Sequence, residues 1–130
     1  MRIAKRERVL PISIYEIDPN EDVRFRLDHN DVEIARSAAP LGAVAEYNTG
    51  AFDTRGYQRI TGIVIADQDG TLFVEHSNDG TNWDSVSQTS YFANDTASFA
   101  FEPRGPSCRI RFVNGSTPQT TFRISVLGAY

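Results

Sequence analysis

Cysteine, histidine and lysine are scarce in this chain of 130 residues, and the first two scarcities each exclude a class of site. Cys108 is the only cysteine, which rules out an internal disulfide and a zinc site built from several cysteines. The two histidines, His29 and His76, cannot fill a metal site by themselves. Lys5 is the only lysine, and the other basic residues are arginines, whose planar guanidinium groups suit interfaces with carboxylates and carbonyl groups.

A surplus of positive charge and long apolar runs are also missing. The formal net charge is −4, so the chain lacks the basic surface that neutralises phosphates, and we expect no nucleic-acid partner. No apolar run approaches the roughly 20 residues of a membrane span. The charged start at residues 1–8 has no apolar stretch behind it, unlike a secretory signal. We therefore expect a protein that folds in the cytoplasm and has no membrane partner.

The chain does have a series of short β-type runs separated by turn-forming residues. No helical period persists beyond Pro40. Apolar residues alternate or cluster in residues 41–47, 59–66, 71–77, 97–101, 108–112 and 122–126. Residues 59–66 are nearly all apolar, which predicts a central strand buried on both faces, whereas residues 32–39 predict one helical turn that ends at Pro40. Together the runs predict an all-β protein, either a sandwich or a barrel.

The most informative stretch is residues 70–84. Leu72, Val74 and His76 alternate with the side chains of the opposite face, so this run predicts a strand. The Asn-Asp-Gly sequence at residues 78–80 tolerates a left-handed backbone and predicts a chain reversal. Trp83 follows this turn, and we expect it either to lie across the turn or to reach into the core.

The first forty residues are denser in charge than the rest of the chain. We divide the chain into residues 1–22, an N-terminal arm or edge strand, and residues 23–130, a β-sandwich domain whose first strand covers residues 23–27. Two alternatives stay open for the start of the chain. Either its strands complete the sandwich, or residues 1–15 leave the domain and lie along a sheet edge of a neighbouring subunit.

Residues of catalytic type do not form a set in this sequence. His76 and Ser77 are adjacent on a strand, so their side chains diverge to opposite faces and cannot act together as base and nucleophile. We interpret His76 as partly buried and hydrogen-bonded, His29 as solvated, and Cys108 as a small buried hydrophobic residue. We therefore predict that the protein is not an enzyme and has no catalytic residue and no cofactor.

Two kinds of binding site are alternatives. Six turn residues carry oxygen ligands of the kind that calcium prefers: Asp67, Asp69, Asn78, Asp79, Asn82 and Asp84. Their spacing departs from that of the calcium-binding loop, and β-turns need the same residue types, so we predict no metal site. Four aromatic residues could form a platform for a glycan, although a lone tryptophan after a turn is more often buried in the core: Trp83, Tyr57, Tyr91 and Tyr47.

Five segments, taken together, carry a family resemblance. They are Pro-Leu-Gly-Ala at residues 40–43, Phe-Asp-Thr-Arg-Gly-Tyr at 52–57, Gly-Thr-Leu at 70–72, Ser-Asn-Asp-Gly-Thr-Asn-Trp-Asp at 77–84 and Arg-Ile-Arg-Phe-Val-Asn-Gly at 109–115. This part of the chain, residues 40–130, resembles a module common in structural proteins of tailed bacteriophages, and the turn at 77–84 is its most specific piece. The resemblance implies an antiparallel β-sandwich, jelly-roll-like, with the first residues as an extended N-terminal arm.

The resemblance also implies a non-enzymatic virion protein, assembled in the host cytoplasm. The small size and the charged arm favour a capsid decoration (cement) protein that binds the assembled head shell. The implied partners are the major capsid protein or another virion protein, and further copies of this chain in a dimer or trimer. The predicted contact residues are Arg2, Lys5, Arg6, Arg8, Ile12, Ile14 and Tyr15. The alternative function is a glycan- or receptor-binding module of a tail fibre or baseplate.

Overall fold

The computed structural model describes residues 31–130, which form nine β-strands. The described residues contain no helix, and so none that could span a membrane. The strands are β1 (Asp31–Ser37), β2 (Glu46–Asn48), β3 (Phe52–Asp53), β4 (Arg59–Ala66), β5 (Gly70–Ser77), β6 (Ser85–Tyr91), β7 (Thr96–Phe101), β8 (Ser107–Asn114) and β9 (Phe122–Ala129). The predicted strands at 59–66, 71–77, 97–101, 108–112 and 122–126 are confirmed.

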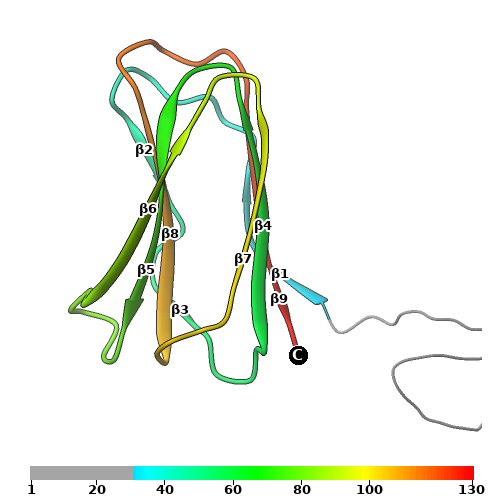
Figure 1. Ribbon diagram of the computed structural model, residues 1–130, viewed down its shortest axis with the longest axis vertical. Coiled ribbons are helices and arrows are strands. Elements are labelled where there is room, and N and C mark those ends of the chain that lie inside the picture. Colours follow the sequence, from blue (N-terminus) through cyan, green and yellow to red (C-terminus); the bar gives the residue numbers. More distant parts are fainter. Residues whose placement is uncertain (1–30) are drawn as a thin grey trace, which may run out of the picture. The chain divides into compact units, whose positions relative to one another are not determined.

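The strands form two sheets that pack face to face (Figure 1). One sheet has the order β1-β9-β4-β7, and the other has the order β2-β8-β5-β6, with β3 also pairing with β8. The pairs of β4 with β7 and β9, and of β8 with β2, β3 and β5, are antiparallel. The predicted class, an antiparallel β-sandwich, is therefore confirmed.

The core lies between the sheets and is built from alternate residues of the strands. In β8 and β9 every second side chain is buried, because successive side chains of a strand point to opposite faces. Phe112 of β8 contacts Phe122 of β9, with ring centroids 5.3 Å apart, and Tyr91 packs on Phe112 at 5.5 Å. The Tyr91 hydroxyl also accepts a hydrogen bond of 2.8 Å from the backbone N–H of Ala66 in the other sheet. The rings therefore join the two sheets near the ends of β4, β6 and β8 and the start of β9.

Three expectations about strands need correction. Residues 32–39 do not form a helical turn, because β1 occupies most of this segment as a strand. The alternation at 41–47 yields a strand only from Glu46, since Val44 has a positive φ of 50° and belongs to a turn. β4 is central in its sheet but buried on one face only: Ile60 and Val64 are buried, whereas Ile63 is 48% exposed.

The N-terminal predictions lie outside the described residues. They comprise the arm or edge strand at residues 1–22, the strand at residues 23–27 and the boundary between them. These remain predictions.

Candidate functional site

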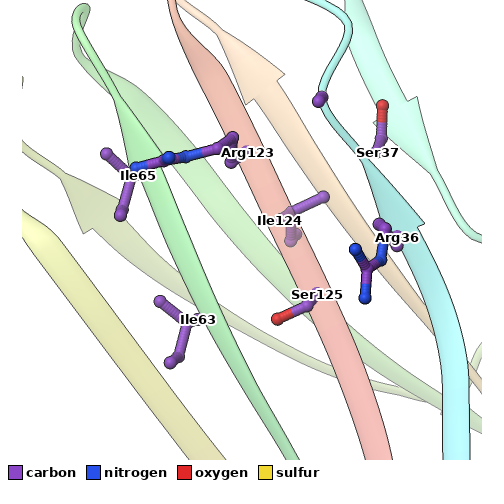
Figure 2. Close-up of a pocket in the computed structure, with 8 residues that line it drawn as sticks. Arg36, Ser37, Ile63, Ile65, Arg123, Ile124 and Ser125 are labelled. Carbon is purple, nitrogen blue, oxygen red and sulfur yellow. The ribbon is translucent and has the colours of Figure 1, made fainter.

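The outer face of β4 and β9 carries three apolar side chains, of which Ile63 is exposed and the other two are half-buried, beside a threonine and a serine. We call it the plain face: Thr61, Ile63, Ile65, Ser125 and Leu127. Ile63 lies opposite Ser125 and Ile65 lies opposite Arg123 in the pairing of the two strands. A shallow hollow of about 290 Å³ opens there, and Arg36 and Ser37 of β1 line its far side (Figure 2). A second hollow of about 460 Å³ adjoins it at Ile63 and continues to Leu127. The face is therefore open and partly apolar.

The charged residues of β4 and β9 are all basic. β4, β7 and β9 contain no acidic residue. Arg59 and Arg123 stand near the ends of the face and are exposed. At the β1 side, Arg36 pairs with Glu33 at 2.6 Å. A neutral centre with arginines at its border fits a protein surface that brings apolar and acidic side chains.

The outer face of β5 and β8 has the opposite character, and we call it the paired face: Glu75, Arg109 and Arg111, with Glu46, Phe73 and Trp83 around them. The Glu75 side chain is only 3% exposed and is bonded by both arginines, with Arg111 Nη2 at 2.8 Å from its Oε2. Arg111 also reaches Glu46, at 2.9 Å. Burial alone would raise the pKa of Glu75, but Arg111 and Arg109 outweigh it, and the pKa lies below its ordinary value.

The arginines of the paired face also cover its aromatic rings. The guanidinium of Arg109 lies 4.3 Å from the centre of the Trp83 ring, and that of Arg111 lies 4.3 Å from the centre of the Phe73 ring. Trp83 is half-buried by this contact and does not belong to the core cluster. The expectation that Trp83 lies across the turn region is therefore closer to the structure than a position in the core.

His76 is a structural residue, as predicted. It is 7% exposed, and its ring meets Phe101 edge-on at 5.4 Å. Its Nδ1 accepts a hydrogen bond of 3.4 Å from the backbone N–H of Arg104 and lies 3.9 Å from Cys108 Sγ. Burial, and then the charge of Arg104, lower the pKa of His76. Burial raises the pKa of Cys108 to about 12, so its thiol stays protonated and is a poor nucleophile.

Two turn carboxylates, those of Asp67 and Asp79, accept hydrogen bonds from backbone N–H groups. Asp79 Oδ1 accepts hydrogen bonds of 2.8 Å from the backbone N–H groups of Thr81 and Asn82, and these bonds lower the pKa of Asp79. Asp67 in the same way accepts bonds from the backbone N–H groups of Thr120 and Thr121. Among residues 31–130 no group of three metal-ligating side chains comes together. Asp79 therefore caps its own turn, whereas Asp67 joins the loop after β4 to the loop before β9.

The four candidate aromatic residues do not form a shared platform. Tyr91 is buried in the core, and Tyr47 packs against Phe122. Tyr57 lies against Tyr130, with ring centroids 5.0 Å apart, whereas Trp83 lies under Arg109 of β8. These four rings therefore offer no common surface to a glycan, and glycan binding remains a prediction.

The predicted contact residues all lie outside the described part of the chain: Arg2, Lys5, Arg6, Arg8, Ile12, Ile14 and Tyr15. Sequence reasoning missed the plain face, whose most exposed apolar residue is Ile63. The signal was present as the apolar run of β4, but it was interpreted as burial on both faces.

A family comparison matches residues 26–127, which is more than half of the chain, to the family described as the uncharacterised protein YqxG N-terminal domain. The chain belongs to this family. The matched residues contain strands β1 to β8 and the part of β9 up to Leu127. No curated protein matches the chain in sequence.

Among solved structures, the PBSX exported protein XepA has a similar fold, with a TM-score of 0.70 and 21% sequence identity. The match covers 85% of this chain but 41% of XepA, so the chain spans less than half of that protein's length. A protein of Bacillus endospore appendages and the Tobacco streak virus coat protein match 83% and 82% of this chain, and 96% and 90% of their own. Their identities are 11% and 15%, and their TM-scores of 0.47 and 0.42 carry no argument.

Proposed function

We propose that this protein is a non-enzymatic structural subunit of a bacteriophage virion, and that it decorates the assembled head shell. In this proposal it binds the major capsid protein, or another protein of the virion, by surface contact. The observation that carries the proposal is the plain face, where Ile63 is 48% exposed beside two hollows and arginines stand at the border.

The physical reason is that exposed apolar area stabilises nothing until a partner covers it, and covering it then lowers the free energy of the complex. A shell repeats the same partner surface many times, so a contact of modest strength at each site is sufficient for stable decoration. The resemblance of residues 40–130 to phage structural modules supports the choice of a virion as the setting. The fold shared with XepA is consistent with this setting but does not by itself indicate a role.

The N-terminal residues have a separate part in the proposal. The segment at residues 10–15 alternates apolar side chains, and basic residues precede it at positions 2, 5, 6 and 8. Such a segment suits strand addition to the edge of a partner sheet, with the basic residues at acidic groups nearby. We therefore assign Ile12, Ile14 and Tyr15 the apolar contacts, and Arg2, Lys5, Arg6 and Arg8 the polar ones.

The test is co-sedimentation of the purified full chain with empty head shells, assembled from the major capsid protein of the same genome. We expect the chain to pellet with the shells. Ile63→Asp, which places a carboxylate in the plain face, is expected to lower the bound fraction at least about tenfold. Deletion of residues 1–15 is expected to do the same.

Val44→Asp is the matched control, because Val44 is an apolar residue that is even more exposed and lies on a turn away from the plain face. Circular dichroism checks that each variant keeps the fold. Undiminished binding of Ile63→Asp would remove the plain face from the proposal, and undiminished binding of the deletion would remove the arm. A wild-type chain that never pellets with shells would refute decoration itself.

A further inference from the structure

β6 is a free edge of its sheet. Within residues 31–130 it pairs with β5 alone, over all seven of its residues. Six of these residues are exposed, on both faces of the strand, and only Tyr91 at its end is buried. Figure 1 shows the reason: toward Ser85 the strand diverges from the opposite sheet. The backbone groups on its outer side therefore have no strand partner among the described residues.

The side chains of β6 do nothing to protect this edge. Its sequence, Ser-Val-Ser-Gln-Thr-Ser-Tyr, contains no charged residue and no proline or glycine. Free edges are usually protected by charge, by proline, by a bulge or by being short. Val86, in addition, is an apolar residue that is 52% exposed.

The opposite side of the sandwich shows the usual protection. β1, the edge of the first sheet, carries Asp31, Glu33 and Arg36. β2 and β3, at the edge of the second sheet, have three residues and two residues. The two sides of the sandwich therefore differ. The side of β1, β2 and β3 is blunted, meaning that its edges are protected by charge or by short strands, and the side of β6 is not.

The unprotected side includes an edge of each sheet. Among residues 31–130, β7 is the outermost strand of the first sheet on this side, and its six residues are uncharged as well. β7 and β6 lie on the same side, because Phe101 of β7 packs on His76 of β5, next to β6. A partner that approaches β6 therefore meets no charged residue of either edge strand.

We propose that β6 pairs antiparallel with β6 of a second copy of this chain across a two-fold axis, so that the sheet continues from one subunit into the other. In the register of full overlap Gln88 lies opposite Gln88 of the second copy, and Val86 lies opposite Ser90. A neutral strand can pair with a second copy of itself, because no like charges meet at the two-fold axis. Pairing of β6 with β7 of another copy would instead be heterologous and would build a ring or an open filament rather than a dimer with one shared contact.

The pairing goes beyond the proposed function and does not depend on shells. Its first test is the mass of the purified full chain by light scattering and sedimentation velocity at micromolar concentration. We expect a dimer. Gln88→Lys places two ammonium groups together at the axis, and we expect it to raise the dissociation constant at least about a hundredfold.

Val32→Lys is the matched control, because it adds the same charge to β1 on the blunted side, where Val32 is also exposed. We expect Val32→Lys to remain dimeric, and both variants to keep the circular dichroism of the wild type. A monomeric wild type would overturn the proposal, and so would a Gln88→Lys variant that stays fully dimeric.

A second test reads the contact directly. Gln88→Cys is expected to form a disulfide-linked dimer under mild oxidation, since opposed residues of antiparallel strands bring their Cβ atoms within about 5.5 Å. The native Cys108 is fully buried and does not compete. Val32→Cys is the control and is expected to stay uncrosslinked. Equal crosslinking of both variants would contradict pairing through β6, whereas loss of shell binding by an intact dimer would contradict only the proposed function.

Discussion

The two outer faces of this sandwich use their side chains in opposite ways. On the paired face, Glu75 is enclosed by Arg109 and Arg111, and each arginine also covers an aromatic ring. On the plain face, Ile63 and its neighbours meet no second layer of described residues, and the acidic groups that would neutralise Arg59 and Arg123 are absent from β4, β7 and β9.

The difference indicates which face is complete within one subunit. The buried carboxylate of Glu75 is tolerated because Arg109 and Arg111 neutralise its charge and donate hydrogen bonds to its oxygens. The paired face therefore needs no partner. An exposed isoleucine contributes little to the stability of the fold, and its burial by a partner stabilises the complex instead. The predictions below test this contrast, in order of the decreasing effect expected at the residue under test; the control variants are not ranked.

The largest effect is expected from Glu75→Gln. The substitution removes the one carboxylate that both arginines of the paired face share and leaves two half-buried positive charges side by side. We expect a loss of about 3 kcal/mol in the free energy of unfolding, measured by chemical denaturation. Glu46→Gln is the control: Glu46 is 40% exposed and has one of these arginines as its partner, so we expect a loss below about 1 kcal/mol. Equal losses would mean that burial of Glu75 is unimportant.

The second prediction concerns how the sheet of the plain face is held from its inner side. Gly62 of β4 lies under the Phe99 ring, and a Cβ atom there would stand 2.7 Å from the backbone oxygen of Ser125. We expect Gly62→Ala to cost about 2 kcal/mol, because neither the backbone nor the packed ring has room to yield. Gly42→Ala is the control, since no atom lies within 4 Å of its added Cβ. A neutral Gly62→Ala would show that this sheet is loosely packed.

Much of the fold could be predicted because alternation is a local property of the chain. β8 and β9 alternate buried and exposed residues in the order that their sequences indicate. β3 has two residues, too few to show any period. The sequence of β1 does not indicate a strand, because the adjacent apolar residues Ile34 and Ala35 break the alternation. In the structure both of these residues are half-buried.

The two faces were harder to predict, because both depend on which strands and layers become neighbours. The sequence places Glu75, Arg109 and Arg111 on alternating strands, but their contact depends on the pairing of β5 with β8. The run of β4 looks the same whether one or two of its faces are covered. Ile63 could therefore be recognised as exposed only from the arrangement of the layers.

The third prediction concerns the pH dependence of stability. It arises from His76, on the inner side of the sheet that carries the paired face. Burial lowers the pKa of His76 below its ordinary value of 6.5, so on acidification the unfolded chain takes up a proton before the folded chain does. We expect the free energy of unfolding to fall as the pH drops below 6.5, and His76→Gln to remove part of this fall. Glu75, whose pKa is also lowered, acts in a separate window below 4.5. An identical pH profile for His76→Gln would mean that the pKa of His76 is the same in the folded and the unfolded chain.

The smallest effect is expected from Ile63→Ser on the plain face, compared with Ile60→Ser on the same strand. Ile60 is fully buried in the core, and its truncation should cost about 3 kcal/mol or more. Ile63 points to the other face and is 48% exposed, so its replacement should cost about 1 kcal/mol or less in the isolated protein. Thermal and chemical denaturation of the two variants, at a concentration held constant, measure the difference. If Ile63→Ser proved as costly as Ile60→Ser, the plain face would already be covered in the free protein, and its contrast with the paired face would disappear.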